Sequence, residues 1–429
     1  MLRLRSLCGL FGMMGLEWLL SSQRRKIRWR IVVGGLLLQF GFAGLILWTP
    51  PGLSAPLGSW LNDGIDFFFH HLESFVAEGS GFLFGIYPRD GDPELTPPVS
   101  LLRSFAFGVL PTIIVFSSLM SVLYYFGVMQ AIVKVMARAM QKTLAVSGAE
   151  SLAAAANVFV GHTEAPLVIR PYIDKMTGSE LHAVMVGGFA TISGGLLAAY
   201  AGMGISPGHL VTASVISAPA ALLISKILRP ETETPETMGS VEVHIPRKGV
   251  NVIEAASIGA TDGMKLALNV AAMLLAFLAL IAMIDGAVGG VGWLLGFRDA
   301  SGASTWSLAT GLGYAFAPLA WLMGIESHDC LRAGELLGLK TVANEFIAYE
   351  QLGRWLRPDS DVDLSPRSVR ILTYALSGFA NFGAIGIQIG GIGGIAPNRR
   401  SDLAKFGLRA MIGGALACCM TACIAGMLT

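Results

Sequence analysis

Residues 157–166 of this chain read Asn-Val-Phe-Val-Gly-His-Thr-Glu-Ala-Pro, which places a glutamate, Glu164, inside an apolar stretch. A second glutamate, Glu345, lies in a comparable stretch at residues 340–349, Lys-Thr-Val-Ala-Asn-Glu-Phe-Ile-Ala-Tyr. A carboxylate at membrane depth is unfavourable unless it has a partner, so it marks a candidate functional site. Two such glutamates in corresponding places predict a transport site that is shared between two repeats.

A glycine-aromatic segment follows each glutamate and strengthens the case for repeats. The first reads Gly-Gly-Phe-Ala-Thr-Ile-Ser-Gly at residues 187–194. The second reads Ser-Gly-Phe-Ala-Asn-Phe-Gly-Ala at residues 377–384. The order glutamate, then glycine-aromatic segment, therefore occurs twice along the chain.

The composition is that of an all-α polytopic membrane protein. Of 429 residues, 53% are hydrophobic and only 14% are charged, which is too apolar for a soluble chain of this length. The formal net charge of +1 gives no reason to expect nucleic acid as a partner. The five cysteines include no CxxC pair, and we interpret them as packing residues rather than metal ligands.

Eight stretches are long and apolar enough to be predicted as membrane crossings, since a helix needs roughly 20 apolar residues to span a bilayer. They are residues 7–21, 31–48, 101–128, 181–203, 209–228, 264–285, 368–390 and 404–428. The stretches that carry the two glutamates, residues 150–176 and 327–349, are too interrupted for plain spans. Irregular backbone at membrane depth must be buried or face water, so we predict two re-entrant helical hairpins.

The positive charges alternate between loops and so predict the topology. The basic loops follow the first, third, fifth and seventh crossings, and the loops between them are poor in lysine and arginine. Both termini then lie outside the cytoplasm, and the two hairpins enter from opposite sides, as inverted repeats require. Amphipathic patterns at residues 57–78 and 130–144 predict interfacial helices or, as the alternative, core-packing helices with one wet face, with a possible third segment at 306–324. The apolar stripe of the first segment is Leu61, Ile65, Phe68, Leu72 and Phe75.

With these motifs in view, the chain resembles the concentrative nucleoside transporter family. The resemblance rests on Gly-His-Thr-Glu-Ala-Pro at residues 161–166, Asn-Glu-Phe at 344–346 and Gly-Phe-Ala-Asn-Phe at 378–382, and it runs over nearly the whole chain. It implies eight core spans, two re-entrant hairpins, three interfacial helices and a homotrimer. It also implies import of nucleosides coupled to sodium or protons, in the cell (inner) membrane, with no resident cofactor.

The resemblance also implies a division of the chain. We expect scaffold spans and interfacial helices in residues 1–145 and the first hairpin and first repeat in residues 146–260. A scaffold span with its connection follows in 261–326, and the second hairpin and second repeat occupy 327–429.

The substrate site is expected between the two hairpins. An ionised carboxylate accepts strong hydrogen bonds from hydroxyl groups, so Glu345 is expected to bind ribose, as the resemblance also implies. Glu164 is expected near the base and the cation, unless either glutamate is only a structural partner of Arg170 or Lys340. The full set of predicted substrate residues is His162, Thr163, Glu164, Leu196, Glu345, Phe379, Asn381 and Ala384.

Three positions depart from the family pattern. His162 replaces the usual glutamine; neutral imidazole also donates and accepts, but through two rigidly separated nitrogens, so base selectivity and a pH-dependent site are open questions. Gly383 and Ala384 replace a serine pair, which removes a sugar contact of about 0.5–1.5 kcal/mol. A different sugar, a nucleobase or a modified nucleoside therefore stays an alternative.

The predicted sodium ligands are the family-matched positions Asn157, Val160, Thr191 and Ile192, because broken membrane helices expose oxygen atoms that suit this hard cation. Thr191 keeps a hydroxyl group, which favours sodium over protons. We predict no enzyme activity, since there is no HExxH motif and the seven histidines do not cluster with carboxylates at ligand spacing. A passive channel would not need paired hairpins. The predicted mechanism is alternating access, with hairpins and broken spans moving against a static trimeric scaffold.

Overall fold

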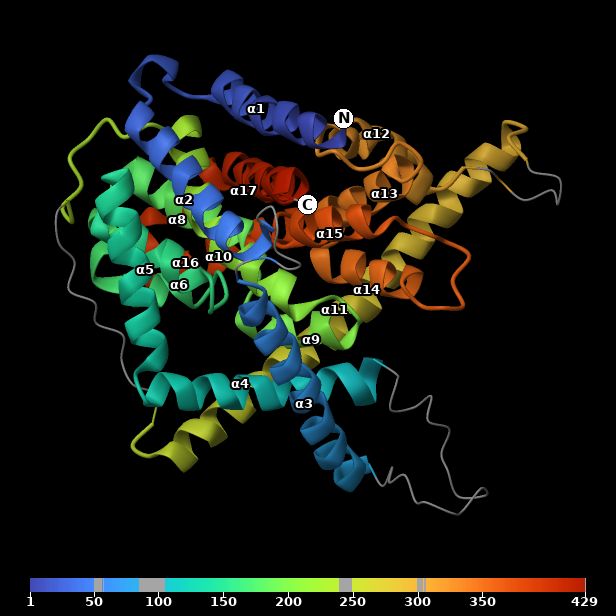
Figure 1. Cartoon of the computed structure of the whole chain (residues 1–429), viewed down its shortest axis with the longest axis horizontal. Helices are drawn as coiled ribbons and strands as arrows, with labels where there is room; N and C mark the ends of the chain where they lie inside the picture. Colours follow the sequence, from blue (N-terminus) through green and yellow to red (C-terminus); the bar gives the residue numbers. More distant parts are fainter. Residues whose placement is uncertain are drawn as a thin grey trace.

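A computed structural model describes residues 1–49, 56, 58–84, 105–238, 249–298, 304 and 306–428, and this part of the chain is almost entirely helical (Figure 1). The predicted all-α membrane fold is thereby confirmed. The helices are α1 (Leu2–Leu20), α2 (Trp29–Leu47), α3 (Ser59–Phe84), α4 (Leu110–Tyr125), α5 (Val128–Leu144), α6 (Gly148–Asn157), α7 (Ala165–Val168), α8 (Gly178–Ala190), α9 (Gly194–Gly202), α10 (Pro207–Leu228), α11 (Val252–Leu294), α12 (Leu308–Leu322), α13 (Cys330–Val342), α14 (Glu345–Trp355), α15 (Pro366–Leu376), α16 (Phe382–Ile395) and α17 (Arg400–Leu428).

Six helical segments of the described chain are long and apolar enough to cross a membrane, which agrees with an integral multi-pass membrane protein. They are Trp29–Leu47, Ala106–Tyr125, Gly178–Gly202, Pro207–Leu228, Val252–Leu294 and Pro397–Leu428. The other two predicted crossings correspond to α1 and to the pair α15 and α16. The total of eight stays a prediction.

Two of the predicted crossings are interrupted near their middle. The first breaks at residues 191–193, between α8 and α9, and the second at residues 377–381, between α15 and α16. The two breaks pack against each other, because a Cβ atom on Gly378 would lie 2.6 Å from the carbonyl oxygen of Phe189, near the end of α8. Only glycine permits this approach, so the glycine-aromatic segments predicted from the sequence form a joint between the repeats.

The two predicted hairpins, α6 with α7 and α13 with α14, begin at opposite ends of α1. Ser22, just after α1, donates from its backbone N–H to the carbonyl oxygen of Leu228 at 2.9 Å. Nearby, Lys226 forms an ion pair of 2.7 Å with Glu150 in the first turn of α6. At the other end of α1, Arg5 donates to the hydroxyl of Ser327, just before α13, at 3.3 Å. This arrangement agrees with the prediction from the loop charges that the two hairpins enter the membrane from opposite sides.

Helices α4 and α11 form a pair beside the body that contains α17 (Figure 1). Helix α11 has 43 residues and is therefore about 65 Å long, far longer than the crossing predicted at residues 264–285. Gly259 and Gly263 lie one turn apart and admit the backbone of α4; a Cβ atom on Gly259 would lie 2.6 Å from the carbonyl oxygen of Ser117. Small residues at this spacing are typical of close helix pairs in membranes.

The predicted amphipathic helices at residues 58–78 and 130–144 form. In α5, Val133 and Met140 are buried while Lys134 and Arg138 are exposed, as the pattern indicates. In α3, Leu72 of the predicted apolar stripe is buried with Phe69 and Val76, whereas Leu61, Phe68 and Phe75 of the stripe are exposed. Asp66 of α3 accepts a hydrogen bond from the backbone N–H of Gly208, at the start of α10, at 2.8 Å. The interfacial placement of α3 stays a prediction. The third amphipathic segment, at residues 306–324, contains α12, and residue 57 lies outside the described residues.

Candidate functional site

A cavity of about 800 Å³ lies where the tips of both hairpins meet the broken helices. All eight predicted substrate residues line it, together with residues of α4 and α11. Glu164 and Glu345, which are 181 positions apart in sequence, thus face one shared space. A concave site with a few polar groups among apolar walls is the usual form of a small-molecule site.

Glu345 is the first residue of α14 and is only 3% exposed. Its carboxylate accepts a hydrogen bond from the hydroxyl of Tyr200 at 3.1 Å and another from the amide nitrogen of Asn381 at 3.3 Å. Tyr200 belongs to α9, and Asn381 is the residue that caps α16. The second half of each broken helix therefore supplies a donor to the same buried carboxylate.

Asn381 uses both ends of its side-chain amide. The nitrogen donates to Glu345, while the oxygen accepts from the backbone N–H of Ala384 at 2.8 Å and so begins α16. This double role explains the choice of asparagine, because aspartate has no N–H to offer the carboxylate. The break in the second repeat is therefore built around the same side chain that positions Glu345.

Glu164 lies in a different environment on the opposite tip. It is exposed to the cavity, and within the described residues its carboxylate is in no hydrogen bond or ion pair. Neither proposed structural partner pairs with Glu164 within the described residues: Lys340 donates to the carbonyl oxygen of Ala375 at 2.8 Å, and Arg170 forms no ion pair with the carboxylate. The carboxylate is thus free to bind a solute or an ion.

His162 packs between the tip of the first hairpin and Phe379. The two ring centroids are 4.7 Å apart in an edge-to-face arrangement. Both ring nitrogens of His162 are shielded from solvent and have no hydrogen-bond partner in the described structure. Buried polar atoms normally have a partner, so these nitrogens are available to a bound solute.

The residues predicted to bind sodium lie where the first hairpin meets the break between α8 and α9. The side-chain oxygen of Asn157 is buried and has no partner among the described residues. Thr191 donates its hydroxyl hydrogen to the carbonyl oxygen of Gly187 at 2.9 Å, which leaves the hydroxyl oxygen able to accept. A Cβ atom on the same Gly187 would lie 3.1 Å from the Asn157 amide nitrogen, so Asn157 and Thr191 are neighbours.

Val160 and Ile192 complete the predicted sodium set. Val160 lines the cavity, and Ile192 is buried in the break itself. Either residue has only a backbone carbonyl to offer a cation. The orphaned Asn157 oxygen fits a hard monovalent cation, which prefers oxygen ligands.

Several cavity residues were not predicted from the sequence. Asp262 and Asn269 reach the cavity from α11, and Tyr124 reaches it from α4. The signal was present: two polar residues seven positions apart fall on one face of an otherwise apolar helix. Tyr200 was also missed, although it donates to Glu345.

A largely apolar cavity with a few polar groups, walled by broken membrane helices, defines the architecture of a secondary transporter. Three family models agree with this class. "Na+ dependent nucleoside transporter N-terminus" matches residues 8–86, "Nucleoside recognition" matches 106–207 and "Na+ dependent nucleoside transporter C-terminus" matches 209–426. The chain belongs to the Na+-dependent nucleoside transporter family.

Individual relatives are similar over the full length of this chain. An "Uncharacterized transporter" of Haemophilus influenzae is 45% identical, over 99% of this chain and 97% of the relative. "Sodium/nucleoside cotransporter 1" of Rattus norvegicus is 42% identical over 95% of this chain, which spans 61% of that longer relative. The solved structure "CNTnw in an inward-facing substrate-bound state" is 42% identical with a TM-score of 0.89, and the match covers 99% of both chains.

Proposed function

We propose that this protein imports nucleosides across the cell membrane by sodium-coupled alternating access. The observation that carries the proposal is the cavity between the hairpin tips, in which Glu345 is held by two broken-helix donors and Glu164 faces the same space. The relative named as a sodium/nucleoside cotransporter supports the choice of both cargo and ion.

The chemistry of the cavity suits a neutral solute with hydroxyl groups on one side and a flat base on the other. Glu345 accepts hydrogen bonds from the ribose hydroxyls, and such charge-assisted bonds are roughly twice as strong as neutral ones. Phe379 and Leu196 supply apolar surface, and His162 offers its unpartnered nitrogens to the base edge. Gly383 and Ala384 line the wall without hydroxyls, so the sugar is bound by fewer groups than a serine pair would supply.

Sodium binds beside the first hairpin, at Asn157 and Thr191 with the carbonyls of Val160 and Ile192. One monovalent cation that moves down about 100 mV supplies roughly 2.3 kcal/mol. Since about 1.4 kcal/mol corresponds to a factor of ten, this suffices for an accumulation of some tens-fold. One ion per solute is therefore enough for concentrative uptake.

The proposed motion carries the two hairpins and the broken helices past the pair formed by α4 and α11. That pair contributes one wall of the cavity and packs closely through Gly259 and Gly263. A homotrimer, as the resemblance implies, would place three such carriers around a static scaffold. Native mass spectrometry of the purified protein measures that stoichiometry.

A proton-coupled importer is the second candidate, because His162 lines the cavity and an imidazole is a side chain that can carry a proton. Its cargo could equally be a nucleobase or a modified nucleoside, given the absence of the serine hydroxyls. The ion and the cargo are separate questions, and one assay answers both.

The test is uptake of labelled uridine, adenosine and hypoxanthine into proteoliposomes of the purified protein. An inward sodium gradient at equal pH should drive accumulation of the nucleosides, and replacement of sodium by choline should suppress it. Accumulation that follows a pH gradient without sodium would show that the coupling ion is the proton. Accumulation of hypoxanthine alone would show that the cargo is a nucleobase and not a nucleoside.

A further inference from the structure

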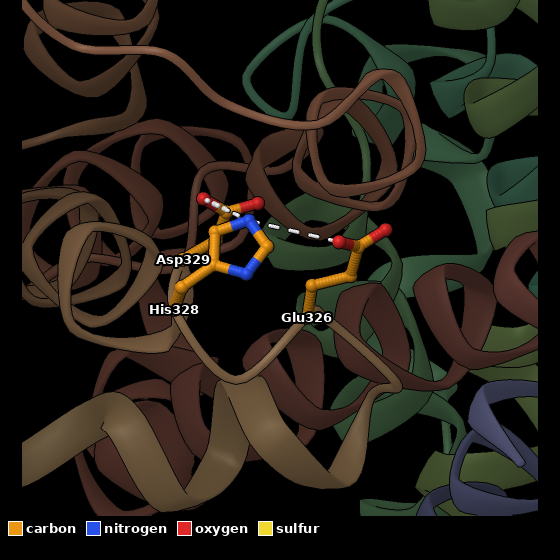
Figure 2. Close-up of side chains that lie close together, drawn as sticks. All are labelled: Glu326, His328 and Asp329. Carbon is orange, nitrogen blue, oxygen red and sulfur yellow. Dashed lines mark ion pairs between the residues drawn. The ribbon is translucent and has the colours of Figure 1, made fainter.

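Three metal-ligating side chains meet outside the transport cavity, in the turn between α12 and α13. They are Glu326, His328 and Asp329, within four consecutive positions (Figure 2). The expectation that no histidine clusters with carboxylates at ligand spacing was therefore wrong at His328. The Nε2 atom of His328 lies 3.6 Å from a carboxylate oxygen of Glu326 and 3.5 Å from a carboxylate oxygen of Asp329. Figure 2 shows the imidazole ring between the two carboxylates.

These distances are those of ligand atoms around one tetrahedral ion. Zinc bonds to imidazole and carboxylate measure about 2.0–2.2 Å, so two ligands at a tetrahedral angle lie roughly 3.3–3.6 Å apart. The three ligand atoms of the turn all lie within 4.8 Å of one another. A small closure of the Glu326 and Asp329 carboxylates therefore completes three corners of a tetrahedron and leaves the fourth for water.

The buried ligand is held in place by the protein. The side chain of Asp329 is 3% exposed, and its Oδ2 atom accepts from the backbone N–H of Ser365, the residue that caps α15, at 3.2 Å. The other oxygen, Oδ1, faces His328. The backbone N–H of Asp329 donates to the carbonyl oxygen of Glu326 at 2.9 Å, which fixes the turn. Outer-shell bonds of this kind orient metal ligands and raise metal affinity.

The open side of the cluster gives a metal ion a way in. The side chains of His328 and Glu326 are 67% and 32% exposed. Two arginines lie nearby: Arg5 donates to the hydroxyl of Ser327, and Arg367 donates to the carbonyl oxygen of Gly324. Their positive charges oppose a divalent cation, so we expect a moderate affinity rather than that of a closed structural site.

We propose that Glu326, His328 and Asp329 form a binding site for a divalent transition metal of the zinc type. An imidazole ligand disfavours magnesium and calcium, which take oxygen ligands. The turn contacts the start of α1 and so lies on the side of the chain that the loop charges place outside the cytoplasm. Because Asp329 joins the base of the second hairpin to α15, a bound ion restrains that hairpin and slows transport.

Metal binding is tested on the purified full-length protein by isothermal titration with zinc chloride. The parent should bind one zinc ion at this turn, and His328→Gln should bind it at least about 10-fold more weakly, since even outer-shell changes cost 10–100-fold. The matched control is the double variant His70→Gln, His71→Gln, which removes an exposed histidine pair on α3. The control should retain the site. Unchanged binding by His328→Gln, or loss of binding in the control alone, would overturn the proposal.

The effect of bound zinc on transport is tested separately, and this second test rests on the proposed function. The binding experiment does not depend on the proposed function. External zinc should slow uridine uptake by proteoliposomes of the parent and of the α3 control, and an equal concentration of magnesium should not. His328→Gln should transport at the parental rate with or without zinc. Equal slowing of His328→Gln would contradict the proposed site, and zinc binding without slowing would contradict the restraint.

Discussion

The two hairpin tips carry the same residue in opposite states. At the second tip, Glu345 is buried and already accepts hydrogen bonds from Tyr200 and Asn381. At the first tip, Glu164 is exposed to the cavity, and its carboxylate is in no hydrogen bond or ion pair among the residues described. A carboxylate with its orientation fixed before the solute arrives loses little freedom on binding, whereas an unpaired one must be ordered by the solute.

The two glutamates therefore have different roles in binding, although they occupy corresponding places in the two sequence repeats. The tip with Glu345 is a rigid anchor, because its donors come from helices that also form the breaks. The carboxylate at the other tip, Glu164, is a variable partner in the sense that no hydrogen bond or ion pair fixes its orientation before the solute binds. It lies next to His162 and to the residues proposed for sodium. Substitutions at the two tips should therefore differ in what they do to stability and to binding.

The largest expected effect is that of Glu345→Ala. The variant loses the charge-assisted bonds to ribose, each worth about 1.5–3 kcal/mol, and leaves the Tyr200 hydroxyl and the Asn381 amide facing an empty space. Uridine uptake per transporter should fall by about 100-fold or more while the protein still reaches the membrane. Surface expression and initial uptake rate are measured together. Concentrative uptake at the parental rate would remove Glu345 from the site.

The contrast between the tips is sharpened by the neutral variants Glu164→Gln and Glu345→Gln. Each should weaken uridine binding by about 10-fold, the equivalent of one charge-assisted bond. Only Glu345→Gln should also lower the melting temperature without solute, because only Glu345 has protein partners. Thermal unfolding by intrinsic fluorescence measures this. Equal melting temperatures for the two variants would end the distinction between anchor and variable partner.

The proposed sodium site predicts that substitutions beside the first tip change the sodium dependence of uptake. Asn157→Ala should raise the half-saturating sodium concentration by about 10-fold, because it removes a buried oxygen that has no other partner. Thr191→Ala should act in the same direction, and the matched control Thr191→Ser, which keeps the hydroxyl, should stay near the parent. Sodium dependence of uridine uptake is the measurement. If Asn157→Ala kept the sodium dependence of the parent, the sodium site would lie elsewhere.

A smaller effect is expected from Tyr200→Phe, which deletes one donor to Glu345 and keeps the ring. A neutral donor contributes about 0.5–1.5 kcal/mol, so uridine affinity should fall by roughly 2- to 10-fold. Equilibrium binding of labelled uridine reports it. A loss as large as that of Glu345→Ala would show that the hydroxyl has a role beyond positioning the carboxylate.

The smallest expected effect concerns selectivity. His162→Gln should change the ratio of uridine to adenosine uptake by a few-fold while it leaves the overall rate near that of the parent, because an amide also donates and accepts. Competition between the two nucleosides tests this. A ratio in His162→Gln equal to that of the parent would exclude the imidazole from base recognition.

The sequence predicted the membrane fold, the family and eight of the residues that line the cavity, because these depend on apolar run length and on local motifs. It placed the first break at Thr191 and Ile192, where the structure has it. It did not place the second break, at residues 377–381, because that break depends on contacts between distant segments, such as Gly378 against Phe189. The contribution of Asp262 and Asn269 was also missed, since apolarity alone marks α11 as a plain span. Ligand roles at the site stay predictions.

The most direct test of the account is equilibrium binding of labelled uridine, in saturating sodium, to the parent, Glu164→Gln, Glu345→Gln and the double variant. If one solute is held between both tips, each single variant should bind about 10-fold more weakly and the double variant more weakly still. Binding of uridine by the double variant with parental affinity would contradict the central claim.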